Sequence, residues 1–311
     1  MCGIVGFTGR ENALPILIKG LYSLEYRGYD SAGVAAFTKD GLRVVKARGR
    51  IANLEEKIKE EGGDMYCTCG IGHTRWATHG EPSDRNSHPH LGGKGKVAVV
   101  HNGIIENYKE LRERLEAHGY EFKSETDTET VAHLVDYLHT GKQEDLAKTV
   151  LQAVQRLRGS YALGVVSMDN TQEIVAARRG NPLVIGIGEG ENMIASDITA
   201  IINRTKRYII LDDNEVAIVR PDSVVVMNEF GDAVEKEIMT VTWDMSAAEK
   251  GGYQHFMLKE IMEQPKALRD TIVINGSTTF MVGLSSAFAA YLSLTGIPRT
   301  LAAALIGVTD N

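Results

Sequence analysis

The sequence predicts an α+β fold with antiparallel sheets, and two observations favour this class. In the first half, strand-like apolar runs and helical stretches follow one another irregularly, without the strict strand–helix–strand alternation of a parallel sheet. From residue 161 to about residue 241, short apolar runs are separated only by turn residues. These runs predict strands over residues 162–167, 174–177, 183–187, 193–195, 208–211, 215–219 and 224–227.

The elements of the first half follow from their spacing. Residues 4–7 are apolar and predict a buried strand, whereas residues 12–26 have the apolar spacing of a helix. The stretch Ser124-Glu125-Thr126 followed by acidic residues is typical of a helix start. The remaining predictions are a hairpin of strands 34–37 and 42–47, a helix over 51–61 ended by Gly62-Gly63, strands 66–73 and 96–101, and helices 105–118, 131–139 and 146–157.

Length and composition bound the possible functions. The chain has 311 residues, enough for one large domain or two modest ones, and 43% of them are hydrophobic. The net charge of −7 argues against a general affinity for nucleic acid or for anionic lipid. Three cysteines are too few for a disulfide framework, and residues 1–30 lack the pattern of a signal peptide. We therefore expect a cytoplasmic protein.

The last seventy residues differ from the rest in composition. Residues 247–264 are charged and polar and predict a linker that ends at Pro265. Residues 271–298 contain no charged residue, but Ser, Thr and Gly are frequent and Gly276 and Gly283 interrupt the stretch. A membrane-spanning helix needs about 20 mostly apolar residues. The composition favours the start of a second domain over a membrane span.

Cys2 is the first candidate for chemistry. If Met1 is removed, Cys2 carries both a thiol and a free α-amine, whose ordinary pKa is about 7.7–8.0. A nucleophile with an adjacent base is a minimal covalent catalyst, and an N-terminal amine is one way to supply that base. The alternative is a small buried cysteine at the start of an edge strand.

Arg75 and Asp127 supply one cation and one anion. A free amino acid requires this pair, because its carboxylate matches the planar guanidinium and its ammonium group needs a carboxylate. Each residue also has a commoner role, Arg75 on a surface loop over residues 72–80 and Asp127 at the cap of a helix.

Asn102-Gly103 follows a predicted strand and precedes a predicted helix. A side-chain amide and a backbone N–H at such a place can form an oxyanion hole, in which each donor contributes about 2.7–4 kcal/mol to the transition state. Asn-Gly is also the commonest turn dipeptide.

The histidines and cysteines do not predict a metal site. His73, His79, His88, His90 and His101 have no known ligand spacing, and we expect Cys67 and Cys69, on one strand, to point to opposite faces. The glycine-rich stretch 186–190 has the wrong spacing for a phosphate loop and predicts a hairpin turn. We expect no metal.

Five motifs in order resemble the class II, N-terminal-cysteine glutamine amidotransferases. They are residues 2–6 (CGIVG), 26–33 (YRGYDSAG), 73–80 (HTRWATHG), 101–107 (HNGIIEN) and 124–129 (SETDTE). The forms of the second and third motifs are similar to those of the glutaminase domain in the glutamine–fructose-6-phosphate aminotransferases. The resemblance covers about residues 2–240, and residues 253–270 resemble the entry into that family's sugar-phosphate domain.

The resemblance implies a four-layer αββα sandwich of the N-terminal-nucleophile hydrolases, without a cofactor. It also implies hydrolysis of L-glutamine through a thioester on Cys2. The implied catalytic residues are Cys2, as nucleophile with its amine as base, and Asn102 and Gly103, as oxyanion donors. The implied ligands of glutamine are Arg75, Thr78, His79 and Asp127. Arg27 is implied to support the region around Cys2, and Trp76 to lie in the loop that closes over glutamine and gates ammonia passage. The histidines take no part in proton transfer in this scheme.

The same resemblance implies a domain plan that this chain does not complete. We expect a glutaminase domain over residues 2–240, a linker over 241–270 and an incomplete or divergent tail over 271–311, where the family has sugar-isomerase domains. In the full-length family we expect a homo-oligomer or a sugar-phosphate-binding partner domain, and ammonia passes to fructose 6-phosphate. The alternatives are a subunit that acts in trans on another acceptor and an inactive remnant that binds glutamine.

Overall fold

The structure of the chain is a computed structural model. It describes residues 2–61, 66–77, 80–139 and 145–242, together with a few single positions after residue 260. The chain divides into two compact units, Met1–Ala248 and Glu249–Asn311, and nearly all described residues belong to the first. The predicted linker and tail therefore lie almost wholly outside the described residues, as does the Gly62-Gly63 helix end.

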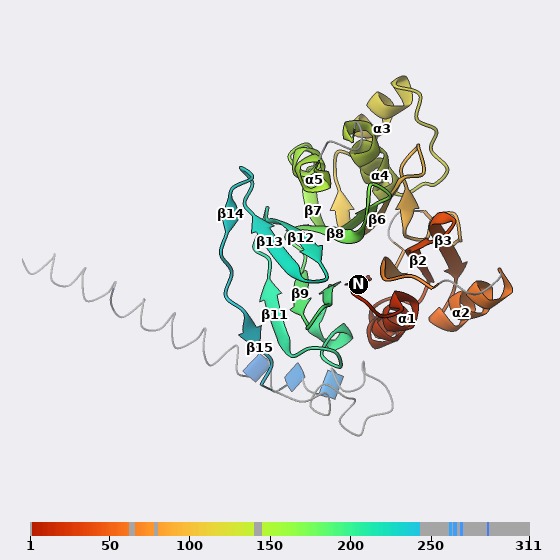
Figure 1. Cartoon of the computed structure of the whole chain (residues 1–311). Helices are drawn as coiled ribbons and strands as arrows, with labels where there is room; N and C mark the ends of the chain where they lie inside the picture. Colours follow the sequence, from red (N-terminus) through yellow and green to blue (C-terminus); the bar gives the residue numbers. More distant parts are fainter. Residues whose placement is uncertain are drawn as a thin grey trace, which may run out of the picture. The chain divides into compact units, whose positions relative to one another are not determined.

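Two antiparallel sheets form the centre of the first unit (Figure 1). The eight-stranded sheet has the order β15-β11-β9-β10-β1-β4-β2-β3, and the seven-stranded sheet has the order β14-β13-β12-β8-β7-β6-β5. The strands are β1 Gly3–Thr8, β2 Ser31–Thr38, β3 Gly41–Arg48, β4 Cys69–Arg75, β5 His90–Leu91, β6 Val97–Ile105, β7 Gly159–Ser167, β8 Asn170–Arg179, β9 Val184–Ile187, β10 Asn192–Ala195, β11 Arg207–Ile210, β12 Val216–Arg220, β13 Ser223–Met227, β14 Ala233–Val234 and β15 Met239–Thr240.

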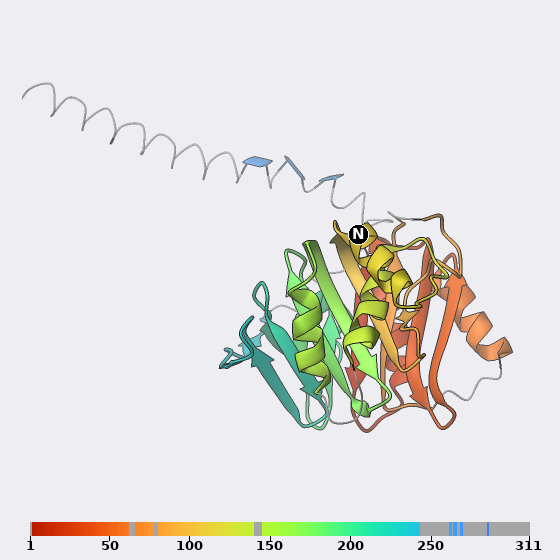
Figure 2. The ribbon, with the colours of Figure 1, turned by 90° about the horizontal axis from the view of Figure 1, so that it is seen from above.

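Helices cover the outer face of each sheet. In Figure 1, α1 and α2 lie on one side of the two sheets, and α3, α4 and α5 lie on the other. The helices are α1 Ala13–Leu24, α2 Ile51–Glu60, α3 Tyr108–Ala117, α4 Asp127–Leu138 and α5 Leu146–Val154, with the short 3₁₀ turns η1 Glu25–Arg27 and η2 Ile198–Ala200. The order helix, sheet, sheet, helix confirms the four-layer αββα sandwich, and Figure 2, after a quarter turn, shows the yellow-green helices in front of the strands.

Three hydrophobic cores fill the three spaces between these layers. One lies between α1, α2 and the larger sheet, one between the two sheets, and one between the smaller sheet and α3, α4 and α5. Strands in the middle are buried on both faces. In β6, Val97 and Val99 face the helices whereas Ala98 and Val100 face the other sheet, which is why the sequence there is apolar without interruption.

Most predicted elements are confirmed, but two strands end later than predicted. β4 continues through Arg75, so residues 72–75 are buried strand and not surface loop, because Thr74 pairs with Gly3 of β1 and Arg75 with Ser31 of β2. β6 continues through Ile105, and α3 begins only at Tyr108. Asn102-Gly103 is therefore inside a strand, and the turn alternative is excluded.

One smaller prediction is confirmed, and another rested on a wrong premise. Residues 188–191 form the turn between β9 and β10, with the Gly188 N–H donating to the carbonyl of Glu191 at 3.0 Å. Cys67 and Cys69 pack in different cores, but the predicted reason was wrong: β4 begins at Cys69, so Cys67 precedes the strand, and residues two apart within a strand face the same side. Within the part of the chain that the structure describes, every helix is too short or too polar to cross a membrane.

Candidate active site

A cavity of about 260 Å³ opens where the ends of β4 and β6 and the start of α4 meet. Seven of the nine predicted site residues line it. These are Cys2, Arg27, Arg75, Trp76, Asn102, Gly103 and Asp127. The other two, Thr78 and His79, lie outside the described residues. Positions spread over 125 residues of sequence thus share one cavity.

Cys2 stands directly before β1, with its thiol against the backbone of Trp76. The Trp76 N–H donates to Sγ at 3.2 Å, and Sγ lies 3.5 Å from the Trp76 carbonyl oxygen. Burial raises the pKa of the Cys2 thiol above its usual value, although the Trp76 N–H and the charge of Arg75 oppose the rise. At neutral pH the sulfur therefore holds its proton, and a nearby base is needed to activate it.

The Asn102 side chain is fixed in orientation by hydrogen bonds at both ends. Its Nδ2 donates to the Cys2 carbonyl at 3.1 Å, and its Oδ1 lies 3.0 Å from Nε2 of His73. The same Nε2 lies 3.0 Å from the carbonyl of His101. Because both neighbours are acceptors, His73 carries its proton on Nε2 and donates to both. The second hydrogen of the Asn102 amide remains available at the cavity.

Gly103 follows Asn102 in β6 with φ +130, a conformation that strongly favours glycine. A Cβ atom at this position would lie 2.1 Å from the Ser160 carbonyl oxygen and 2.7 Å from Nδ2 of Asn181. The conformation re-aims the backbone at the cavity, next to the Asn102 amide. Glycine is needed here both for its φ and for the close approach of β7.

Arg75 is the last residue of β4, and backbone carbonyl groups hold its guanidinium in place. It donates to the carbonyls of Gly80 at 3.1 Å and Glu81 at 3.4 Å, and only 4% of the residue is exposed. Gly28 packs against the Arg75 backbone, since a Cβ atom there would lie 2.8 Å from the Arg75 carbonyl carbon. These contacts fix the Arg75 guanidinium in one position, and a fixed guanidinium is suited to binding a carboxylate.

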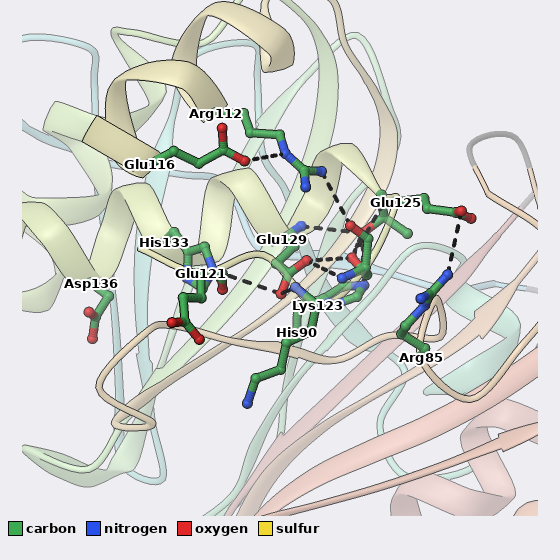
Figure 3. A network of polar contacts seen from close by, with 12 residues as sticks. Arg85, His90, Arg112, Glu116, Glu121, Lys123, Glu125, Glu129, His133 and Asp136 are labelled. Carbon is green, nitrogen blue, oxygen red and sulfur yellow. Dashed lines mark hydrogen bonds and ion pairs between the residues drawn. The ribbon is translucent and has the colours of Figure 1, made fainter. Parts of the chain in front are cut away.

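Asp127 is the first residue of α4 and lies on the cavity wall. One oxygen accepts the Ile105 N–H at 2.9 Å, and His101 Nδ1 lies 4.0 Å from the same oxygen. A capping network holds the helix start (Figure 3). The Thr126 hydroxyl accepts the Glu129 N–H, and the Glu129 carboxylate accepts the N–H of Lys123 at 2.9 Å. The anion is therefore positioned by β6 on one side and by its own helix cap on the other.

Arg27 and Trp76 line the cavity from its rim. Arg27 donates to the Ser196 carbonyl at 3.2 Å and pairs with Asp197 at 3.3 Å, and the Ser196 hydroxyl accepts the Ile4 N–H. It therefore braces the strand that carries Cys2. Trp76 is 44% exposed, with an edge contact to Tyr29 at 5.8 Å between ring centroids.

Sequence reasoning missed a cluster of buried histidines at the site, and one of them, His88, lines the cavity. His73 and His88 lie 4.2 Å apart between ring centroids, and His88 is 5.1 Å from His90. Burial lowers the pKa of His73 to about 3, and it lowers the pKa values of His88 and His90 well below the usual range. These rings are neutral at physiological pH. Their count was visible in the sequence, but not their burial in one place.

Sequence reasoning also missed three further cavity residues, Ser160, Asn181 and Pro182. Ser160 precedes a predicted strand, and Asn181 precedes a proline in a connection that looked like an ordinary turn. No motif singled them out. Among the described positions, there is no group of three His, Cys, Asp or Glu side chains that could hold a metal ion.

A known protein family matches the part of the chain that contains most of these site residues. The family model described as a glutamine amidotransferase domain matches residues 73–203, a range that contains Arg75, Asn102, Gly103 and Asp127. Two solved structures are similar in fold. Glutamine phosphoribosylpyrophosphate amidotransferase from B. subtilis, complexed with ADP and GMP, covers 75% of this chain and 50% of its own chain, with a TM-score of 0.61 and 27% identity. A structure titled as the allosteric regulatory enzyme of purine biosynthesis has a TM-score of 0.63 and 27% identity, over 73% of this chain and 49% of that one.

Curated relatives are more similar still. The chain is 54% identical over 272 residues to glutamine–fructose-6-phosphate aminotransferase (isomerizing) of Clostridium tetani, over 88% of this chain and 44% of the relative. The proteins of the same name from Aquifex aeolicus and Methanosarcina acetivorans are 52% and 49% identical, over 88% of this chain and 45% of each relative. The chain thus spans a little under half the length of these relatives. It belongs to the glutamine amidotransferases of the N-terminal-nucleophile type, and its sequence is similar to part of the glutamine–fructose-6-phosphate aminotransferases.

Proposed function

We propose that this site hydrolyses L-glutamine to glutamate and ammonia through a γ-glutamyl thioester on Cys2. The observation that carries the proposal is the placement of a thiol, two oxyanion donors, a fixed cation and a fixed anion around one cavity of about 260 Å³. Each of these groups has a common structural use. Their convergence matches one substrate, a free amino acid with a side-chain carboxamide.

The two charged residues bind the amino-acid end of glutamine. Arg75 presents a planar guanidinium to the α-carboxylate, and Asp127 accepts hydrogen bonds from the α-ammonium group. Both are nearly buried, so their charges are weakly screened and hold the substrate in register. Glutamine then enters with its carboxamide directed toward Cys2.

The chemical step begins when the Cys2 sulfur attacks the carboxamide carbon. The carbonyl oxygen becomes an oxyanion between the Asn102 amide and the Gly103 N–H, which stabilise the developing charge. The carbon–nitrogen bond breaks as the leaving nitrogen takes a proton, so ammonia departs and the thioester remains. Water then attacks the thioester, glutamate is released and the thiol is restored.

The α-amine of Cys2 is the base in this proposal, once Met1 has been removed. Burial keeps the thiol protonated, so a base must accept its proton as the sulfur attacks. His73 is a poor candidate, because a pKa of about 3 makes it a weak base and its Nε2 already donates to two acceptors. An amine with an ordinary pKa of about 7.7–8.0 suits both proton transfers near neutral pH.

The acceptor of the ammonia and the setting of the chain are further proposals. By analogy with the relatives, a sugar-phosphate-binding domain receives ammonia for transfer to fructose 6-phosphate, and residues 2–240, 241–270 and 271–311 are glutaminase domain, linker and tail. We place the protein in the cytoplasm and expect a homo-oligomer in the full-length form, without nucleic-acid or membrane partners. An acceptor supplied in trans is the second candidate, and a stably co-purifying synthase would favour it.

Replacement of the nucleophile tests the proposal. We expect Cys2→Ala to abolish glutamate formation from glutamine while the melting temperature stays unchanged. Intact-mass analysis of the active protein should show loss of Met1, and an electrophilic glutamine analogue should add one adduct, on Cys2. Glutamate formation at the unsubstituted rate by Cys2→Ala, or no adduct on a protein that binds glutamine, would contradict the proposal and favour an inactive remnant.

A further inference from the structure

Asn181 supplies a buried hydrogen-bond donor that the proposed reaction has not used. Its Nδ2 is shielded from solvent and lacks a hydrogen-bond partner within the described ranges. Burial of an amide N–H without a partner costs about 1–3 kcal/mol, so such groups are rare unless a ligand satisfies them. Asn181 lines the same cavity as Cys2, Asn102 and Gly103.

The position of this amide is next to the oxyanion donors. A Cβ atom at Gly103 would lie 2.7 Å from Nδ2 of Asn181, so the amide packs directly against the Gly103 backbone. The positively charged Arg75 and the negatively charged Asp127 already account for the two ends of the amino-acid backbone. The group closest to Gly103 is therefore the carboxamide of the substrate rather than its carboxylate.

The connection between β8 and β9 holds Asn181 in place before substrate arrives. Gly180 forms a β-bridge with Tyr161 of β7, and its N–H donates to Asp213 at 2.9 Å. Asp213 in turn pairs with Arg178 at 2.9 Å. Pro182 follows Asn181 and restricts its backbone to extended conformations. A donor fixed in this way loses little entropy when substrate binds, which is the property required of an oxyanion donor.

We propose that Asn181 contacts the substrate and donates a third hydrogen bond to the γ-carbonyl oxygen, beside the Gly103 N–H. This inference rests on the proposed glutaminase function and adds a residue to its machinery. The hydrogen bond strengthens as negative charge grows on that oxygen during attack by Cys2. Its loss therefore lowers kcat more than it raises the KM for glutamine.

A pair of variants separates hydrogen bonding from packing. Asn181→Leu keeps the side-chain size without a donor, whereas Asn181→Ser is smaller and keeps a hydroxyl donor. We expect kcat for glutamine hydrolysis to fall about a hundredfold in Asn181→Leu, the lower end of the effect of losing one oxyanion donor, with KM changed less than about twofold. Asn181→Ser should retain more activity than Asn181→Leu, although a role in packing alone predicts the opposite order.

Two controls make each outcome decisive. Asn181→Ala removes the donor without adding bulk and replaces the leucine variant if that variant does not fold. Cys2→Ala, measured beside it, tests the proposed function separately. Suppose that the unsubstituted protein hydrolyses glutamine and Cys2→Ala does not. If Asn181→Ala and Asn181→Leu then keep the unsubstituted kcat, the proposed role of Asn181 is wrong, whereas the proposed glutaminase function is supported. An unsubstituted protein with its Met1 removed that does not hydrolyse glutamine overturns both.

Discussion

At the scale of single residues, the site depends on positions where only one side chain fits. Gly103 is the clearest, because its φ of +130 coincides with the close approach of the Ser160 carbonyl. Gly95 also has a positive φ, +70, but a Cβ atom there would meet nothing within 4 Å. The two glycines separate the effect of backbone conformation from the effect of space.

We expect Gly103→Ala to lower the free energy of unfolding more than Gly95→Ala does. The backbone term is about 1–2 kcal/mol for each variant, and overpacking against β7 adds about 1–3 kcal/mol for Gly103→Ala alone. Urea denaturation measures both values, and the glutaminase rate of Gly103→Ala should also fall. Equal free energies of unfolding for the two variants would contradict the close packing described here.

His73 is a positioning residue in this account, because it acts through Asn102. Replacement by Phe removes the donor to Asn102 Oδ1 and keeps an aromatic ring, whereas replacement by Gln keeps an amide donor at similar reach. We expect His73→Phe to lower kcat by about tenfold or more, since the oxyanion amide loses its fixed orientation. His73→Gln should recover part of that loss.

The KM for glutamine should change little in both variants of His73, because Arg75 and Asp127 are held by other contacts. Steady-state kinetics measures both parameters. A similar kcat for the Phe and Gln variants would show that the hydrogen bond to Asn102 does not matter.

Residue identity could be predicted from the sequence, but burial could not. The types and order of Cys2, Arg75, Asn102 and Asp127 indicated a glutamine site without coordinates. The sequence did not show that His73 orients an amide. A histidine's role depends on which neighbours bury it, and those neighbours come from β2, β4, β5 and β6.

At the scale of elements, the start of α4 connects helix stability to substrate binding. Thr126 is the N-cap, and its hydroxyl also lies 3.0 Å from Nε2 of His90. We expect Thr126→Ala to lower the free energy of unfolding by about 1–2 kcal/mol, as for other lost N-caps, and to raise the KM for glutamine. Asp127 is the next residue, so fraying of the first turn moves it.

Thr126→Ser keeps the capping hydroxyl and is the matched control. Chemical denaturation and steady-state kinetics on the two variants measure the effects. If Thr126→Ala and Thr126→Ser have the same KM as the unsubstituted protein, the cap does not position Asp127.

The two misplaced element boundaries have a common physical cause. Local sequence predicted ends of β4 and β6 near His73 and His101, where polar residues begin. Both strands continue, because neighbouring strands supply partners for the polar stretch: β1 and β2 for β4, and β7 for β6. Polar residues that serve a site are stabilised by tertiary pairing, which local propensity does not contain. The two strand ends were therefore predicted wrongly at the residues that line the site.

At the scale of the whole molecule, the site exists only when the layers are assembled. Cys2 and Arg75 come from one sheet, Asn102 and Gly103 from the other, and Asp127 from a helix outside the second sheet. The order of apolar runs, helical stretches and turn residues along the sequence was enough to predict antiparallel sheets. It was not enough to predict which sheet contains which strand, because order within a sheet depends on long-range pairing.

The buried histidines make a prediction about acid stability. The pKa values of His73, His88 and His90 are lowered in the fold, so at acidic pH the unfolded chain binds protons that the folded chain does not. These histidines leave the free energy of unfolding nearly unchanged above pH 6.5 and lower it as the pH drops below 6.5. For His73 this decrease continues until the pH reaches its folded pKa of about 3. At pH 5 the loss is about 2 kcal/mol for His73, and His88 and His90 change stability in the same direction.

Urea denaturation at pH 7.5 and pH 5.0 measures the difference. Substitution of His90 by Phe should reduce it, since one proton-binding group is then absent from the unfolded chain. Equal free energies of unfolding at the two pH values would contradict the burial of a neutral histidine cluster.

The central claim is that one terminal residue supplies both nucleophile and base, and its most direct test compares two forms of the chain. One form begins at Cys2, confirmed by intact mass, and the other carries a short extension that cannot be cleaved. We predict glutamate formation by the first form and a loss of at least about a hundredfold in kcat for the second, within the usual contribution of a general base. An extended chain that hydrolyses glutamine at the same rate would contradict the claim.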